Sequence, residues 1–181
     1  RAALPIQGKP PVLMFMGMTN DRAPAGGSFL ERIGAQAGLP MKTNQLVIAD
    51  IDRAKVAEWA KIDPPGYTLE RIDNVVPAAL VAPFIEAANG MNDAPRGDLK
   101  MGDWKLTEEQ IRDRESWLKQ IGSTWWLLVA VDAKTGEGAG FTEINNDPKQ
   151  PWVVWQGGTA VTLGHRGHKL GLWMKAAMLD R

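Results

Sequence analysis

The clearest alternation of apolar and polar positions lies near the end of the chain. Residues 159–163 are mostly β-branched or apolar, which favours a strand. Beyond them, hydrophobic residues recur at the spacing of one buried helical face. These residues are Leu170, Trp173, Met174, Ala177 and Met178. A basic turn at residues 165–169, interrupted by a glycine, separates the two segments, so the pattern predicts a strand, a tight turn and a helix.

The first third of the chain has shorter hydrophobic runs separated by glycine and proline. They predict a strand over residues 11–19, a helix over 29–33, a strand over 42–51 and a helix over 52–61. Ser28 and Glu31 have the spacing of a capping box, and Gly34 would end the first helix. Two prolines and a glycine in residues 63–66 cannot continue a helix, so we place a boundary between two segments there.

The second segment alternates strands and helices. The pattern predicts a strand over 67–72, a helix over 77–88 and a long loop over 89–103. A charged helix through residue 120, capped by residues 106–109, would turn Ile111, Trp117 and Leu118 inward. Strands are predicted at 125–131, 139–145 and 152–163, the last interrupted by a β-bulge at Gly157 and Gly158. These elements indicate an α/β fold.

The basic turn contains both histidines of the chain, together with Arg166 and Lys169. A helix N-terminus leaves backbone N–H groups free and carries a partial positive charge. Basic side chains added there favour an anionic ligand such as a phosphate. The other interpretation is an ordinary corner of an α/β protein with solvated basic residues. The glycine spacing matches neither a Walker A loop nor a dinucleotide-binding fingerprint.

The turn Arg166-Gly-His-Lys-Leu-Gly171 resembles the acetyl-coenzyme A (acetyl-CoA) pyrophosphate loop of the GNAT superfamily of N-acetyltransferases. That family has the pattern Arg/Gln-x-x-Gly-x-Gly/Ala. Arg166 and Gly171 match its first and last positions, whereas Lys169 stands at the inner glycine position. The longer stretch over residues 165–179 is similar to a subgroup with two GNAT modules in tandem. The resemblance implies a GNAT-like acyl-CoA N-acyltransferase fold of the α/β (α+β) class, with a mixed, mostly antiparallel sheet and flanking helices.

Residues 67–179 follow the element order of a GNAT module up to its pyrophosphate-contacting helix. Residues 11–51 have the β–α–β order expected of the remainder, and residues 29–34 resemble the family's late helix end. On one interpretation, residues 1–62 end one GNAT-like module and residues 66–181 form most of the next. On the other, the N-terminal strands complete the later module, as a permuted domain or a swapped dimer. A homodimer or a pairing of modules within one protein is therefore the expected assembly.

The resemblance also implies a reaction. An acetyl group would move from acetyl-CoA, as co-substrate, to the amine of a small molecule by direct attack. Backbone N–H groups around residues 158–161 would polarise the thioester carbonyl, as is usual in the family. The residues expected to bind the co-substrate are Ala160, Val161, Thr162, Arg166, Gly167, His168, Lys169, Leu170 and Gly171. The alternative is a non-catalytic acyl-CoA-binding or scaffolding module, which the altered glycine position favours.

An attacking amine must lose a proton, and Glu143 in the centre of a predicted strand is the candidate catalytic base. The alternation of the strand would equally allow Glu143 to point to solvent. In the long loop, Asn92, Asp93 and Arg96 are the candidate substrate-binding residues, with Asp98 beside them; ordinary turn chemistry is the other explanation. Many family members use a late tyrosine as general acid, and Tyr67, the only tyrosine, is in the wrong place for that.

Composition narrows the remaining classes of function. The net charge is +0, so no overall field favours nucleic acid or an anionic membrane surface as a partner. There is no cysteine, which excludes disulfides, thiolate metal ligands and a cysteine nucleophile. His165 and His168 lack a clear third ligand, so no metal is expected. No apolar run approaches the ~20 residues of a membrane span, and we expect a cytoplasmic protein.

Overall fold

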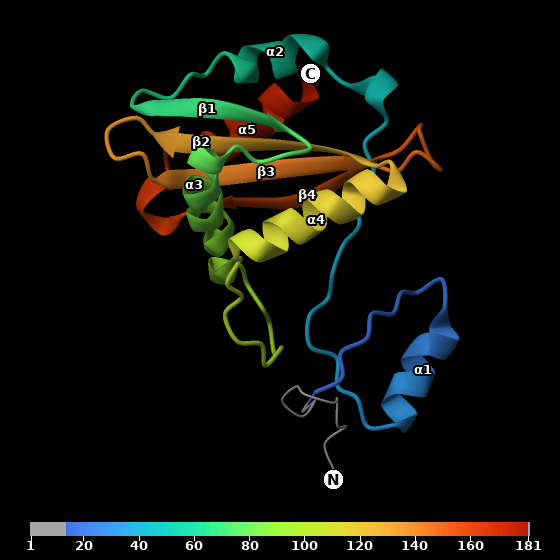
Figure 1. Ribbon diagram of the computed structural model, residues 1–181. Helices are drawn as coiled ribbons and strands as arrows, with labels where there is room; N and C mark the ends of the chain where they lie inside the picture. The colour runs from blue at the N-terminus through green and yellow to red at the C-terminus, as the bar shows by residue number, and fades with distance from the viewer. Residues whose placement is uncertain (1–13, 181) are drawn as a thin grey trace. The chain divides into compact units, whose positions relative to one another are not determined.

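The computed structural model describes residues 14–180, and these residues form two compact units (Figure 1). One unit runs up to Met41 and includes Gly97–Leu99; the other comprises Lys42–Arg96 and the chain from Lys100 onward. The expected division into residues 1–62 and 66–181, as parts of two modules, stays a prediction. No helix in the described range is both long and apolar enough to cross a membrane.

The first unit contains one helix, α1 (Pro24–Arg32). The predicted start was wrong, because the helix begins at Pro24, where the fixed φ of proline suits a first helical residue, and no side chain caps it. Its end was predicted correctly: Gly34 has φ +84° and donates its N–H to the Glu31 carbonyl.

The two strands predicted in the N-terminal third are absent from the described residues. Residues 14–19 have no regular structure, and residues 11–13 of that predicted strand lie outside the described range. Residues 42–51 contain only a 3₁₀ turn, η1 (Ile48–Asp50). Their hydrophobic side chains, including Leu46 and Ile48, are exposed. A strand needs a neighbour to pair with, and an apolar pattern without that partner forms no ladder. The described N-terminal residues therefore do not extend the sheet.

The helix predicted after them is confirmed as α2 (Arg53–Ala60). Asp52 caps it by accepting a hydrogen bond from the Lys55 N–H at 3.0 Å. Val56 is buried, and α2 packs against α5 (Leu170–Leu179), the helix predicted after the basic turn.

The second unit is built on a four-stranded antiparallel sheet with the order β1-β2-β3-β4. Its strands are β1 (Tyr67–Asp73), β2 (Thr124–Asp132), β3 (Gly138–Asn146) and β4 (Val154–Val161). All four were predicted, although β4 ends two residues early because a 3₁₀ turn, η3 (Leu163–His165), follows it. The predicted α/β class with an antiparallel sheet and flanking helices is confirmed.

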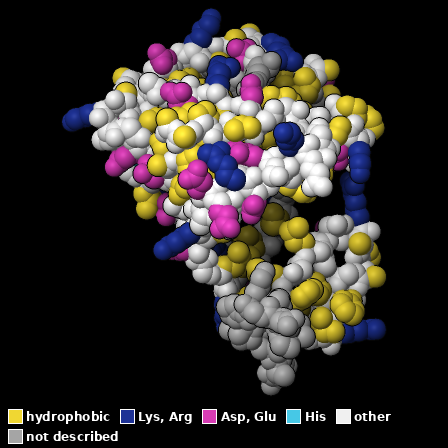
Figure 2. Space-filling view, in the orientation of Figure 1, with side chains coloured by type: hydrophobic (Ala, Val, Ile, Leu, Met, Phe, Trp, Pro, Cys, Tyr) yellow, Lys and Arg dark blue, Asp and Glu magenta, His cyan; other side chains and the backbone are white. Residues whose placement is uncertain are grey.

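Helices cover both faces of this sheet (Figure 1). On one face lie α3 (Ala78–Asn89), the 3₁₀ turn η2 (Gly90–Asp93) and α4 (Glu108–Ile121); on the other lies α5. A capping box between Thr107 and Gln110 opens α4. Ile111 and Leu118 face inward as predicted, but Trp117 is 56% exposed, because each helical residue turns by about 100° and Trp117 precedes Leu118. Acidic and basic side chains are interspersed around α4 (Figure 2).

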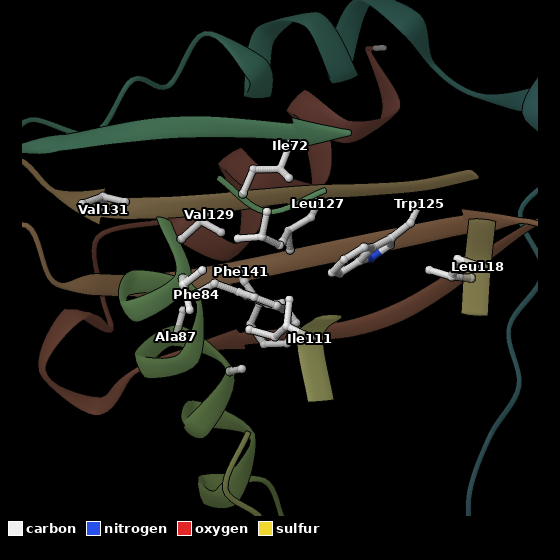
Figure 3. Close-up of a cluster of buried hydrophobic side chains, with 13 residues drawn as sticks. Ile72, Phe84, Ala87, Ile111, Leu118, Trp125, Leu127, Val129, Val131 and Phe141 are labelled. Carbon is white, nitrogen blue, oxygen red and sulfur yellow. The ribbon is translucent and has the colours of Figure 1, made fainter. Parts of the chain in front are cut away.

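Among the described residues, the core has one buried cluster on the face covered by α3 and α4 and two on the face covered by α5. Between the sheet and α3 and α4, the side chains of Phe84, Ile111, Trp125 and Phe141 point toward one another (Figure 3). On the opposite face, Ala130 packs with residues of α5. Alternation along β2 therefore places the rings of consecutive tryptophans, Trp125 and Trp126, on opposite faces, as expected for a strand.

The predicted bulge in β4 is confirmed. The register between β3 and β4 shifts between Thr142 and Ile144, so that Gly157 and Gly158 lie opposite Glu143. A methyl group on Gly157 would lie 2.7 Å from the Glu143 Oε1, and one on Gly158 would lie 2.7 Å from the Phe141 ring. Both glycines are thus required by close approach, and the bulge brings the β4 backbone onto a carboxylate.

Candidate active site

A cavity of about 480 Å³ lies beside the predicted anion-binding turn. Its walls are η2 and the two residues after it, residues 159–161 at the end of β4, and the turn between η3 and α5. We call it the basic cavity. Of the nine residues predicted to bind the co-substrate, all but Thr162 and His168 line it. The structure therefore brings most of the predicted set together around one hollow.

The backbone of the turn presents a helix N-terminus to this cavity. Gly167 (φ +87°) and Lys169 (φ +61°) both adopt the left-handed conformation, and α5 begins directly afterwards. No side chain caps α5, so the N–H groups of its first turn lack acceptors within the helix. Those groups add a partial positive charge to that of the Lys169 side chain. The left-handed φ at Lys169 explains why a glycine suits this position.

Arg166 ties the end of β4 to η2. Its Nε donates to the Val161 carbonyl at 3.1 Å, and its guanidinium lies 3.3 Å from the Asp93 carboxylate. Both side chains remain partly exposed, at 47% and 32%. Asp93 was predicted to bind the acceptor, but the structure places it in the basic cavity, where its negative charge faces Arg166.

His165 and Tyr67 form a contact behind the turn that the sequence did not indicate. The Tyr67 hydroxyl lies 3.0 Å from His165 Nδ1, and Asp132 lies 4.0 Å from the same nitrogen. Burial, and then the nearby Asp132 charge, raise the pKa of Tyr67. Backbone N–H groups of Lys134 and Thr135 lower the pKa of Asp132. Tyr67 and His165 are 98 positions apart, so no local pattern could have paired them.

A second cavity, of about 500 Å³, lies on the face of the sheet covered by α3 and α4. We call it the apolar cavity. Phe84, Ile111, Trp125 and Phe141 belong both to its lining and to the buried cluster (Figure 3), while Trp104 lies half exposed in the wall. Arg114 and Glu143 are the charged residues in its lining.

Glu143 is buried, with 7% of its surface exposed, so the alternative that it points to solvent is wrong. Its Oε2 accepts a hydrogen bond from Trp125 Nε1 at 2.9 Å and pairs with the Arg114 guanidinium at 2.9 Å. Its Oε1 accepts the Gly158 N–H at 3.1 Å. The guanidinium of Arg114 also lies over the Trp125 ring, 4.4 Å from its centre. A buried carboxylate thus has a cationic partner and two neutral donors.

The other candidate substrate-binding residues organise the long loop. The Asn92 side chain accepts the Trp104 N–H at 2.8 Å and donates to its carbonyl at 2.7 Å. Arg96 donates to the Met101 carbonyl and pairs with Asp103 at 2.8 Å. Neither Asn92 nor Arg96 lines either cavity. Their contacts fix the backbone around Trp104, which does line the apolar cavity.

Asp98 belongs to the other compact unit, where its N–H donates to the Gly38 carbonyl. Within residues 14–180, no three His, Asp or Glu side chains gather as a metal site.

The two cavities adjoin along β4. Gly158 lines the apolar cavity, Thr159 lines the basic cavity, and Met91 lines both. A molecule held in the basic cavity and lying along the end of β4 would therefore reach the apolar cavity near Glu143. This arrangement suits a reaction between one ligand with an anionic end and a second ligand with an apolar body.

Comparison with known proteins places this fold. The sheet and its flanking helices have the GNAT-like α/β architecture. A solved structure, "Tandem GNAT protein from the clavulanic acid biosynthesis pathway (without AcCoA)", superposes with a TM-score of 0.58 over 99% of this chain at 24% identity. The chain spans about half of that protein, 49% of its length. No protein-family model and no curated protein sequence matches the chain.

Proposed function

We propose that this chain is an acyltransferase module that moves an acetyl group from acetyl-CoA to the amine of a small molecule. The observation that carries the proposal is the basic cavity, which joins an uncapped helix N-terminus to the edge of β4 that faces away from β3. The GNAT-like fold supports it.

The residues of the basic cavity suit coenzyme A. That molecule has a pyrophosphate and a 3′-phosphate at one end and an arm with two amides that ends in the thiol. The first-turn N–H groups of α5, with Arg166 and Lys169, supply donors and positive charge for the pyrophosphate. Within residues 14–180, β4 pairs only with β3, so some of its main-chain groups face away from the sheet. Those groups could pair with the amides of the arm.

In the proposed reaction, the amine nitrogen attacks the thioester carbonyl carbon. A carbon–nitrogen bond forms, the carbon–sulfur bond breaks, the sulfur leaves as the thiolate of coenzyme A, and the amine loses a proton. We propose that Glu143 accepts this proton. A carboxylate has about four acceptor positions. On Glu143, Oε2 accepts from Trp125 and forms the ion pair with Arg114, and Oε1 accepts from Gly158. The remaining position on Oε1 is the one we propose for the amine.

The carbonyl oxygen gains negative charge during the attack, and backbone N–H groups are the donors proposed to stabilise it. The Gly158 N–H already binds Glu143, so it is not the donor. The proposal therefore falls on Thr159 and Val161, which line the basic cavity and whose N–H groups face away from β3, the one strand that β4 pairs with in residues 14–180. One such donor contributes about 2.7–4 kcal/mol to transition-state stabilisation.

Calorimetry with acetyl-CoA on the full chain tests the proposal. We expect saturable binding that Arg166→Gln weakens about 10- to 100-fold, since a charge-assisted contact contributes about 1.5–3 kcal/mol. Lys134→Gln, in the exposed β2–β3 turn, removes the same charge and should leave binding unchanged. Absence of acetyl-CoA binding would overturn the proposal.

A thiol-release assay with a panel of amines separates the catalytic function from the alternative. Release of coenzyme A that depends on an amine is the expected result. Acetyl-CoA binding without any amine-dependent thiol release would instead support a non-catalytic acyl-CoA-binding or scaffolding module.

A further inference from the structure

The apolar cavity has features of a binding site that the transfer reaction alone does not require. An acetyl group and a bare amine are small, whereas a cavity of about 500 Å³ is within the range of pockets that hold whole small molecules. Its wall includes the aromatic rings of Phe84, Trp104 and Phe141 and the side chain of Met101. These groups suit an apolar body and offer it no hydrogen bond, apart from the indole N–H of Trp104.

Arg114 supplies the polar contact. It extends from α4 into the lining, and its side chain is 36% exposed. One terminal nitrogen pairs with Glu143, and the guanidinium stacks on Trp125. A guanidinium has five N–H donors in a rigid fork. Within residues 14–180, Glu143 is the acceptor that Arg114 reaches, so most of those donors have no protein partner.

A planar fork with unused donors in an apolar wall matches a carboxylate, which can accept two of its N–H groups in parallel. Stacking on Trp125 and the contact with Glu143 hold the guanidinium in place, so little side-chain freedom is lost when a ligand binds. Glu143 balances the charge of Arg114, and a ligand that carries both charges leaves the site neutral.

We propose that the apolar cavity binds an amino acid with an apolar side chain as the acceptor of the acetyl group. Its carboxylate binds Arg114, its amine lies beside Glu143 Oε1, and its side chain contacts the aromatic wall. The proposal rests on the proposed function for the reaction, but the class of ligand follows from Arg114 and the lining.

The spacing of the two polar contacts favours an amine and a carboxylate that are only a few bonds apart. Gly158 and Arg114 bind opposite oxygens of the one Glu143 carboxylate. The free position on Oε1 and the free donors of Arg114 are therefore neighbours. An amine separated from its carboxylate by a long chain would have to fold back to reach both, at a cost in conformational entropy.

Asn92 is assigned a positioning role for this ligand. Its amide forms two hydrogen bonds with the backbone of Trp104 and so fixes the loop that carries the indole. Asn92→Ala should weaken binding of an aromatic amino acid and leave the preference for a carboxylate unchanged, because Arg114 is unaffected.

Calorimetry with three probes tests the proposal, with and without coenzyme A. The probes are L-phenylalanine, phenethylamine, which lacks the carboxylate, and L-alanine, which lacks the ring. We expect L-phenylalanine to bind about 10- to 100-fold more tightly than phenethylamine, as for a charge-assisted contact. L-alanine should also bind at least tenfold more weakly, because it buries less apolar surface.

Variants of α4 assign the preference to one side chain. Arg114→Gln should remove the preference for L-phenylalanine over phenethylamine. Lys119→Gln, at an exposed position on the same helix, should preserve that preference. Because Arg114→Gln leaves Glu143 without its cation, Arg114→Lys serves as a second variant, which keeps the charge and loses the fork. We expect Arg114→Lys to fold and to reduce the preference about tenfold.

Two outcomes would overturn the proposal: phenethylamine binding as tightly as L-phenylalanine, or no binding of L-phenylalanine with or without coenzyme A. If acetyl-CoA still binds and releases thiol with other amines, the proposed function stands and the ligand class is wrong. If L-phenylalanine binds with the expected preference but acetyl-CoA does not, the ligand class is supported and the proposed function fails.

Discussion

The basic cavity and the apolar cavity adjoin along one strand but are built in opposite ways. The basic cavity takes its central feature from a contiguous turn, residues 165–171, whose backbone supplies N–H groups and whose side chains add positive charge. The apolar cavity takes its lining from α3, the long loop, α4 and three strands. A main-chain anion site tolerates change in side chains, whereas a cavity of packed side chains depends on register across the whole sheet.

Gly158 and Glu143 connect the two cavities. The bulge in β4 brings one backbone N–H onto a buried carboxylate, and that carboxylate orders Arg114 and Trp125. Changes at this junction should affect the apolar cavity first. Changes in the turn should affect anion binding and leave the apolar cavity intact.

The largest expected effect comes from Glu143→Gln. The amide keeps the volume but has a single oxygen, so it can accept from Trp125 or from Gly158 and not from both, and it cannot take the amine proton. We expect turnover to fall about 10²- to 10⁴-fold, with acetyl-CoA affinity unchanged, because proton transfer contributes about that factor. Steady-state thiol release and calorimetry measure the two quantities.

Glu86→Gln is the matched control for that change, since its carboxylate also accepts a backbone N–H, from Gly138, outside both cavities. A loss of acetyl-CoA binding in Glu143→Gln comparable to the loss of turnover would contradict the separation of the two cavities.

The next largest effect is expected for Gly158→Ala. The added methyl group would lie 2.7 Å from the Phe141 ring, which is buried and cannot move freely. Overpacking of this kind costs about 1–3 kcal/mol in the free energy of unfolding. Urea denaturation measures it, and Gly102→Ala, where a methyl group meets nothing within 4 Å, provides the comparison. Equal stability of both variants would show that the bulge is not under steric constraint.

A smaller effect is expected at Lys169, whose left-handed φ costs a side chain about 1 kcal/mol. Lys169→Gly removes both the strain and the charge, and Lys169→Ala removes only the charge. We expect the glycine variant to be more stable than the alanine variant by about 1 kcal/mol, with both losing similar acetyl-CoA affinity. Thermal unfolding and calorimetry measure these changes; equal stability of the two variants would refute the strain.

The smallest expected effect concerns Asp93, whose carboxylate competes with an incoming anion for Arg166. Asp93→Asn should raise acetyl-CoA affinity about two- to fivefold, since a partly exposed ion pair contributes about 0.2–1 kcal/mol. Binding of L-phenylalanine in the apolar cavity should not change. Asp113→Asn, on the outer side of α4, is the control of equal charge. Weaker acetyl-CoA binding in Asp93→Asn would mean that the pair orders Arg166 more than it neutralises it.

Local patterns predicted the second unit well. The helical face beginning at Leu170, the cap at Asp52 and the bulge at Gly157 and Gly158 are all confirmed. Each of these features depends on residues that are close together in the sequence. The strand predicted over 42–51 was wrong, because its apolar residues have no strand to pair with in the described structure.

The same distinction between local and long-range contacts applies to the two cavities. The turn predicted to bind an anion is contiguous, so its basic residues and its resemblance to a known pyrophosphate loop could be recognised in the sequence. The pairing of Arg114 with Glu143, and of Tyr67 with His165, joins residues brought together only by the sheet register and the helix packing. No property of the individual segments could place these partners.

Met91, on η2, is part of the wall of both cavities. A substitution that enlarges one cavity at this position therefore reshapes the other as well. Under the proposed function, a substitution at residue 91 would change the range of acyl donors and the range of amine acceptors together. As related proteins diverge, a substitution at residue 91 that admits a bulkier acyl group would also change which acceptor binds.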